Sequence, residues 1–163
     1  MRKLLVILIA LLATWSEFTI GHACGDKTMR VGRGLRFLQM EAKRNPSTIL
    51  IHTRAVPAGK ASRLQEFLKA VGHQANTFDN VDQVSEALKG ARYDVVLTNL
   101  TDARELQNKV SSLSPNTVVV PVTFKSDEAA AATQYRFTVK SPKYAEDFLP
   151  TVNQIMKSRS KKT

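Results

Sequence analysis

Short apolar runs alternate along this chain with longer stretches in which apolar residues recur every three or four positions. The short runs, rich in Val, Ile and Thr, are typical of strands, and the longer stretches are typical of amphipathic helices. The pattern predicts strands at 48–52, 73–78, 94–100, 117–124 and 135–139. It predicts helices at 60–71, 81–90, 103–113 and 144–157, with a short alanine-rich helix after residue 127.

Capping and burial expectations follow from the same pattern. Ser126 and Asp127 precede the alanine-rich helix and are expected to cap it. Gly90 follows the helical pattern of Val84 and Leu88, so a glycine C-cap is expected there. The buried face predicted for the last helix consists of Phe148, Val152, Ile155 and Met156.

The regular alternation of strand and helix sets the fold class. Parallel neighbouring strands need a crossover connection, and right-handed helical crossovers cover both faces of the sheet. Five strand–helix units therefore predict an α/β fold, a (βα)5 doubly wound parallel sheet. The runs at 94–97 and 117–120 are continuously apolar, which is typical of central strands covered on both sides.

The segment 24–46 is expected to be an N-terminal extension with a short helix. Leu35, Leu38 and Ala42 lie on one helical face, and Asn45-Pro46 ends the pattern. Gly32 and Gly34 do not follow an apolar strand and lack the full glycine spacing of a phosphate-binding loop, so a plain hinge is the better interpretation.

The first 23 residues have the pattern of a secretory signal peptide. Arg2-Lys3 precede an apolar run of about 12 residues, shorter than the about 20 that span a bilayer as a helix. Gly21 and Ala23 supply the small side chains that signal peptidase accepts, which predicts a mature chain that begins at Cys24 and is periplasmic or secreted.

Cys24 leaves two further interpretations open. Bacterial lipoproteins are cut before a cysteine that is then acylated, so Cys24 is a candidate lipidation site and the protein a candidate lipid-anchored one. In the second interpretation, Cys24 is a plain unpaired residue near the terminus. A membrane is expected as a partner only if Cys24 is lipidated or the signal segment is retained.

Composition limits the remaining possibilities. A chain of 163 residues, 43% of them hydrophobic, suits one globular domain with its own core. The formal charge of +10 overstates the basicity of that domain, because several basic residues lie in the leader or in the last seven positions. The basic C-terminus is not accompanied by a basic patch with interleaved aromatics, which disfavours nucleic acid as a partner.

Metal and enzyme chemistry find little support. One cysteine excludes an intramolecular disulfide, and His22, His52 and His73 are too far apart in sequence to indicate a metal site. We find no Ser–His–Asp order, no carboxylate pair on adjoining strand ends and no nucleotide-binding loop. No cofactor, no metal and no enzymatic activity are therefore expected.

Specific residues resemble a known family. Three segments together look like the receiver domain of two-component response regulators. They are the run 90–100, in which Tyr-Asp-Val-Val-Leu leads into a helix, Pro121-Val-Thr123 at the end of the fourth strand, and Lys140-Ser-Pro142 after the fifth strand. The resemblance covers residues 47–157. It implies a flavodoxin-like sheet order of 2-1-3-4-5, with a site at the carboxyl ends of the first, third and fifth strands.

Carried over to that site, the resemblance implies a degenerate receiver, or pseudo-receiver. Asn99 stands where a receiver has its phosphoacceptor Asp, and an amide cannot form an acyl phosphate. Thr53 and Arg54 stand where receivers have the acidic pair that holds Mg²⁺. Thr123 and Lys140 match the retained hydroxyl and lysine, although the inserted Ser141 departs from the usual Lys-Pro.

Two functions fit this pattern. The first is a non-catalytic protein-interaction module whose candidate face is 126–157, where Tyr135 lies in the region of the receivers' switching aromatic; the protein partner is unknown. The second is a small-anion-binding domain, in which Arg54 and Lys140 use the former phosphorylation crevice. The plain alternatives are that Tyr135 packs on the sheet and that Arg54 pairs with Asp102.

The predicted organisation is a signal peptide at 1–23, the extension at 24–46, the receiver-like domain at 47–157 and a basic tail at 158–163.

Overall fold

The computed structural model describes residues 25–160, so the predicted signal peptide and Cys24 lie outside the described residues. A boundary between Gly32 and Arg33 separates two units, and the second unit contains the α/β domain. The elements in chain order are α2 (Gly25–Arg44), β1 (Thr48–His52), the 3-10 turn η2 (Thr53–Ala55), α3 (Ala61–Ala70), β2 (Gln74–Phe78), α4 (Val81–Gly90), β3 (Val95–Asn99), α5 (Leu100–Leu113), β4 (Val118–Thr123), α6 (Glu128–Gln134), β5 (Val139–Lys140), the 3-10 turn η3 (Ala145–Phe148) and α7 (Leu149–Ser160).

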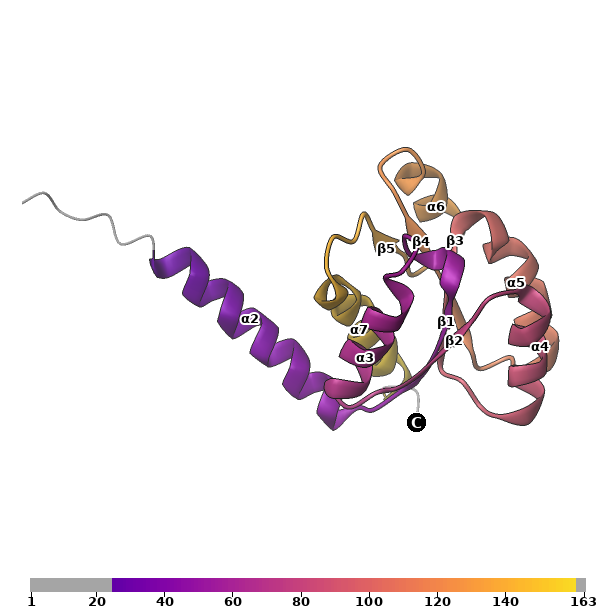
Figure 1. Ribbon diagram of the computed structural model, residues 1–163, viewed down its shortest axis with the longest axis horizontal. Helices are drawn as coiled ribbons and strands as arrows, with labels where there is room; N and C mark the ends of the chain where they lie inside the picture. The colour runs from indigo at the N-terminus through magenta and orange to yellow at the C-terminus, as the bar shows by residue number, and fades with distance from the viewer. Residues whose placement is uncertain (1–24, 161–163) are drawn as a thin grey trace, which may run out of the picture. The chain divides into compact units, whose positions relative to one another are not determined.

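The five strands form one parallel sheet in the order β2-β1-β3-β4-β5, which confirms the predicted order. In Figure 1, α3 and α7 cover one face of the sheet while α4 and α5 cover the other. The predicted central strands are β3 and β4, each of which has a hydrogen-bonded neighbour on both sides. The doubly wound fold class is thus confirmed.

Alternate residues of each strand supply two separate cores. Ile49, Ile51 and Leu97 face the layer of α3 and α7, where they pack with helix residues such as Leu68 and Ile155. The intervening strand residues face the layer of α4 and α5; the fully buried members of this second core are Leu50, Val84, Val96, Leu106 and Val110. The period of two along a strand therefore distributes the apolar runs between both helix layers.

The C-terminal part of α2 belongs to the first of these cores. Ala42 is fully buried, and Leu35 and Leu38 pack beside it, as their spacing predicts. The amide of Asn153 in α7 donates a hydrogen bond of 3.0 Å to the carbonyl of Leu38. The expected short helix is present, although it begins earlier in the chain, at Gly25.

Several local predictions are wrong. Gly90 is the last residue of α4 and not a left-handed C-cap; Ala91, with extended backbone at φ −148°, ends the helix and leads directly toward β3. Two other glycines adopt a positive φ, Gly59 at 76° and Gly72 at 105°, and Gly72 is the one that follows a helix, α3. There the His73 amide donates to the Leu68 carbonyl in a tight helix-ending turn, a conformation that favours glycine.

The fifth strand is shorter than predicted. Only Val139 and Lys140 pair with β4, because Tyr135 still donates its amide to Ala131 and ends α6. Asp127 precedes α6 but has helical backbone and makes no side-chain cap; instead it accepts a hydrogen bond of 3.0 Å from the Ser126 hydroxyl.

The last predicted helix is divided in two. Asp147 accepts the backbone amides of Lys143 and Tyr144 at 2.8 and 2.9 Å, which forms the turn η3 before α7 begins at Leu149. Met156 is half-buried, not buried as predicted, because α7 turns it toward the edge of the core. The helix continues to Ser160, so three residues of the predicted tail are helical.

Candidate functional site

Doubly wound sheets commonly have a crevice at the carboxyl ends of their strands, so we call the residues His52, Arg54, Asn99, Asp102 and Lys140, at this edge of the sheet, the carboxyl-edge crevice. β1 and β3 are adjacent in register, with Ile51 opposite Leu97, so the residues that follow these strands meet at the same edge. Asn99 pairs with Val122 of β4, and Thr123 pairs with Lys140 of β5. The topology therefore gathers the candidate residues at one edge of the sheet.

Asn99 occupies the end of β3 and acts as the N-cap of α5. Its side-chain oxygen accepts the backbone amide of Asp102 at 3.1 Å, and the hydroxyl of Thr98 lies 3.4 Å from the same oxygen. A capping oxygen satisfies a helix amide that has no intrahelical partner. The side chain at the predicted phosphoacceptor position therefore has a structural role in this molecule.

Arg54 lies in η2 beside the same helix start. Its Nη1 is 3.3 Å from Oδ2 of Asp102, while the Arg54 side chain remains 61% exposed and that of Asp102 only 12%. This is the pairing that the plain alternative for Arg54 anticipated. An anionic ligand would therefore compete with Asp102 for this guanidinium. Thr53 precedes Arg54 in η2 and is half-buried.

His52 is the residue of the crevice that the sequence did not indicate as a site. It is fully buried at the end of β1, with Nδ1 at 3.4 Å from both the Thr98 hydroxyl and Oδ2 of Asp102. Its Nε2 lies 3.2 Å from the carbonyl oxygen of Asp79, and since a carbonyl only accepts, this contact requires a proton on Nε2. A polar residue that closes the apolar run Ile49-Leu-Ile was the available signal.

Asp102 joins these groups into one cluster. Its Oδ2 is buried and accepts no hydrogen bond from the described residues; its close polar neighbours are His52 Nδ1 at 3.4 Å and Arg54 Nη1 at 3.3 Å. A buried carboxylate is tolerated only where positive charge or donors compensate for the lost hydration. The cluster therefore holds the single acidic side chain of the crevice in place and leaves no acidic pair for Mg²⁺.

Thr123 and Lys140 are neighbours across β4 and β5 but face different surroundings. The Thr123 hydroxyl is buried and donates to the Val139 carbonyl at 3.3 Å, whereas Lys140 is exposed. Ser141 adopts φ 41°, donates its amide to Thr123 at 2.7 Å and donates its hydroxyl to Glu128 at 2.6 Å. The departure from Lys-Pro is thus built into a defined turn.

Tyr135 lies outside the crevice, at the end of α6. It is half-buried and lines a pocket of about 240 Å³ together with residues of β5 and α7, including Lys140 and Thr151. It does not belong to a strand, contrary to the plain alternative. Tyr144, 66% exposed, and Phe124, 44% exposed, lie at or near the same predicted face.

Two searches concern the described residues alone. Within residues 25–160, no group of three or more His, Cys, Asp or Glu side chains is placed to bind a metal ion. Among the helices of that part of the chain, none has the length and apolar character needed to cross a membrane.

Comparison with known proteins defines the fold and no more. No protein-family model matches the chain, and no curated protein matches it in sequence. Among solved structures, adenylate cyclase from Rhodopirellula baltica is 18% identical, with a TM-score of 0.59 over 72% of this chain and 95% of that one. A signal receiver domain of an HD domain-containing protein from Pseudomonas fluorescens is 16% identical, with a TM-score of 0.55 over 73% and 92%.

A response regulator receiver domain protein from Clostridium thermocellum is similar at 14% identity, with a TM-score of 0.55 over 72% of this chain and 99% of that one. The sheet order defines a doubly wound α/β domain of the flavodoxin-like class. Within that class, the neighbours show that the chain has a receiver-like fold.

Proposed function

We propose that this protein is a non-catalytic pseudo-receiver that works as a protein-interaction module without phosphotransfer. The observation that carries the proposal is that Asn99 occupies the phosphoacceptor position and caps a helix. Its side-chain oxygen caps α5, and an amide nitrogen or oxygen does not provide the carboxylate nucleophile that an acyl phosphate needs. The proposal rests on this chemistry and on the receiver-like fold.

The neighbouring residues support the same conclusion. Mg²⁺ prefers several oxygen ligands with negative charge, whereas this crevice presents Arg54 and buried His52 around one carboxylate, Asp102. The guanidinium of Arg54 repels a divalent cation, and the one carboxylate already pairs with it. In this proposal the scaffold of a receiver is retained together with Thr123 and Lys140, while Thr53, Arg54 and Asn99 replace the acidic pair and the phosphoacceptor.

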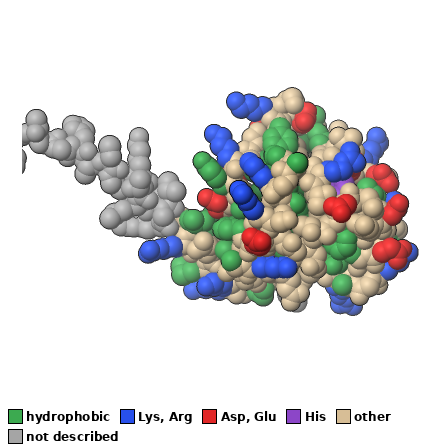
Figure 2. Space-filling model, in the orientation of Figure 1, with side chains coloured by type: hydrophobic (Ala, Val, Ile, Leu, Met, Phe, Trp, Pro, Cys, Tyr) green, Lys and Arg blue, Asp and Glu red, His purple; other side chains and the backbone are tan. Residues whose placement is uncertain are grey.

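The surface formed by α6, β5, η3 and α7, residues 126–157, is the proposed interaction face. Tyr144 exposes an aromatic ring, and Tyr135 lines a small pocket beside Lys140. Figure 2 shows hydrophobic and basic side chains together on the side of α6 and α7. Exposed aromatic rings with adjacent cationic side chains are frequent anchors of protein interfaces.

The proposed site of action is the periplasm or the exterior, with a lipid anchor at Cys24 as the variant of this proposal. It is supported by the leader pattern of residues 1–23. A compartment without an ATP-fed histidine kinase domain is consistent with a receiver that no longer transfers phosphate. Intact mass of the protein from soluble and membrane fractions tests this address, since a chain that retains Met1 would contradict export.

Small-anion binding in the carboxyl-edge crevice is the alternative function. The pairing of Arg54 with Asp102 counts against it, because an anion would compete with a carboxylate for one of the two proposed cations. Lys140 remains exposed at the crevice. We therefore favour the interaction module.

The experiment combines a phosphoryl mimic with variants of the proposed face. Beryllofluoride or acetyl phosphate with Mg²⁺ is expected to leave the thermal unfolding curve and the NMR amide spectrum unchanged, because neither nucleophile nor metal site is present. In partner capture, Tyr144→Ser and Tyr135→Ala are expected to reduce recovery of a specific protein. Leu113→Ser, which alters an exposed apolar residue at the end of α5, is the matched control.

Two outcomes contradict the proposal. A saturable response to beryllofluoride would show that the crevice still binds phosphoryl groups. Equal capture by the wild type, both tyrosine variants and Leu113→Ser would remove the proposed face from the interaction.

A further inference from the structure

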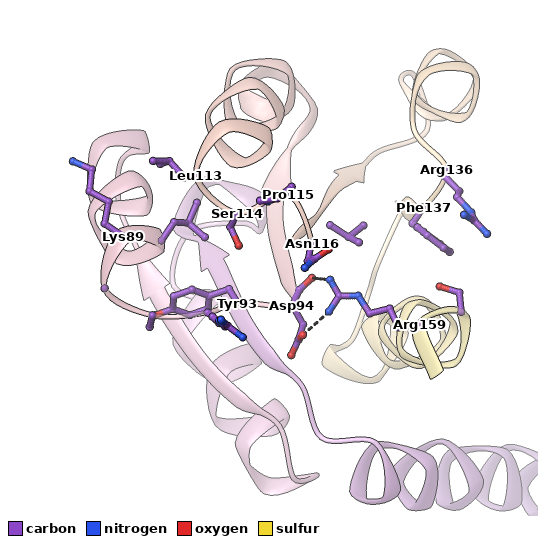
Figure 3. A pocket seen from close by; sticks show the side chains of 16 residues that line it. Lys89, Tyr93, Asp94, Leu113, Ser114, Pro115, Asn116, Arg136, Phe137 and Arg159 are labelled. Atoms are coloured by element: carbon purple, nitrogen blue, oxygen red, sulfur yellow. Dashed lines mark hydrogen bonds and ion pairs between the residues drawn. The ribbon is translucent and has the colours of Figure 1, made fainter. Parts of the chain in front are cut away.

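A second concavity lies at the opposite edge of the sheet, where β3 and β4 begin. We call it the amino-edge groove; its volume is about 1080 Å³. It is enclosed by the end of α4, the start of β3, the loop between α5 and β4, the segment before β5 and the last turns of α7, as Figure 3 shows. Its charged lining residues are Lys89, Arg92, Asp94, Arg136 and Arg159.

Asp94 and Arg159 form the centre of this groove. The two side chains are paired, and Arg159 Nη2 also donates to the Asp94 carbonyl at 3.2 Å. The Asp94 carboxylate accepts the backbone amide of Thr48 at 2.8 Å. Figure 3 shows Arg159 pointing across the groove to Asp94. This pair is neutral as a unit and fixes the two sides of the groove relative to each other.

The remaining basic side chains are not neutralised in this way. Lys89 makes a 2.7 Å exposed pair with Glu86, whose contribution is small because both groups are solvated. Arg92 and Arg136 form no ion pair with any residue of the part of the chain that the structure describes. Arg136 lies over the Phe137 ring at 5.1 Å from its centroid, which orients the guanidinium.

A concave surface lined by charge of one sign focuses the electrostatic potential and concentrates ions of the opposite sign. Guanidinium groups bind carboxylate and phosphate groups through paired hydrogen bonds. Ser114 and Asn116, in the loop before β4, add uncharged polar groups to the lining. The volume is sufficient for a small organic ligand, whose sites are commonly about 300–1,000 Å³.

We propose that the amino-edge groove binds a small ligand that carries two or more carboxylate or phosphate groups. Arg92 and Arg136 of the lining supply the charge contacts, and the Asp94–Arg159 pair holds the start of β3 against α7 within the groove. This site lies at the other edge of the sheet from the carboxyl-edge crevice, and it shares Arg136 with the proposed interaction face. Arg136 also lines the pocket beside Tyr135, whereas Arg92 lines only the groove, which makes Arg92 the cleaner position to alter.

The test is calorimetric titration of the purified chain with inorganic pyrophosphate and, separately, with citrate at constant ionic strength. We expect at least one of the two to bind with a dissociation constant below about 1 mM. Arg92→Gln is expected to weaken that binding about tenfold through the loss of a charge-assisted contact. Arg63→Gln, an equal loss of charge at an exposed position of α3, is the matched control and is expected to bind as the wild type does.

Each outcome supports or overturns the proposal. Binding of pyrophosphate alone identifies a phosphate ligand, and binding of citrate alone identifies a carboxylate ligand. The proposal is overturned if neither anion binds, if binding appears only with a long polyanion, or if Arg63→Gln weakens binding as much as Arg92→Gln. Loss of binding in Arg54→Gln with none in Arg92→Gln would assign the anion to the carboxyl-edge crevice instead. Unfolding midpoints of the variants show that each remains folded.

Discussion

His73 is a buried histidine whose protonation opposes folding. Its Nδ1 accepts the Ser47 amide at 3.2 Å and lies 2.8 Å from the Ser47 hydroxyl, so Nδ1 must be unprotonated. Its Nε2 is buried without a hydrogen-bond partner among the described residues. Burial lowers the pKa of His73 below its ordinary value, and the nearby Asp94 carboxylate opposes part of this effect.

The sign of the resulting pH dependence follows from linkage. Because the folded-state pKa of His73 is lowered, the unfolded chain binds its proton more tightly. The stabilisation is fully present above about pH 6.5 and is lost as the pH falls from there toward the folded-state pKa. In His73→Gln, whose amide oxygen can still accept from Ser47, we expect a smaller loss of unfolding free energy between about pH 7.5 and about pH 5.5.

Urea denaturation at the two pH values measures this difference. Glu86→Gln removes an exposed titratable group and serves as the control. If His73→Gln lost as much stability as the wild type over this interval, the titration of His73 would not be the cause.

At the scale of elements, Asp94 connects the start of β3 to β1 through the Thr48 amide and to α7 through Arg159. Asp94→Ala is expected to lower the free energy of unfolding by about 1–3 kcal/mol, since it removes the acceptor of the Thr48 amide and the partner of Arg159. Glu86→Ala removes an exposed pair within α4 and is expected to change stability by less than about 0.5 kcal/mol. Chemical denaturation of both variants measures the contrast; equal losses would refute the role of Asp94 as a tie between elements.

The strand predictions are correct for strands that are covered by helices on both faces and paired on both sides, and they are wrong for the edge strand β5. β3 and β4 each begin with a continuous apolar run and are present near their predicted positions. The run Tyr135–Val139 alternates like a strand, yet only its last residue pairs, because β5 has one neighbour and α6 ends at Tyr135. Local pattern does not tell where an edge strand begins to pair.

Site prediction had a similar limit. The resemblance to receivers located Thr53, Arg54 and Asn99 at one edge of the sheet, and β1 and β3 are adjacent parallel strands, so their carboxyl ends do meet there. His52 was not predicted as part of the site, since its role depends on Asp102 and Asp79, which lie far from it in sequence. The amino-edge groove was not predicted either, because Arg136 was assigned to a strand and Arg159 to a solvated tail.

At the scale of the whole molecule, stability depends on two cores separated by one sheet. Leu106 of α5 is fully buried in the core that faces α4, whereas Leu113 of the same helix is 40% exposed. Leu106→Ala is expected to lower the free energy of unfolding by about 2–4 kcal/mol, because it leaves a cavity in close-packed surroundings. Leu113→Ala is expected to change it by less than about 0.5 kcal/mol.

Both values follow from chemical denaturation, with circular dichroism to show that the fold is retained. A loss for Leu106→Ala no larger than that for Leu113→Ala would mean that this core is loosely packed.

The strand order also determines how the domain can assemble as the chain emerges N-terminus first. Once β1 and β2 have paired, β3, β4 and β5 join the same growing edge in the order in which they appear. The last helix, α7, then bonds back to α2 through Asn153 and Leu38 and to β3 through Arg159 and Asp94. A nascent chain that stops before α7 therefore carries a complete sheet on which the part of one apolar face that α7 covers is exposed, and such a chain is prone to aggregation and proteolysis.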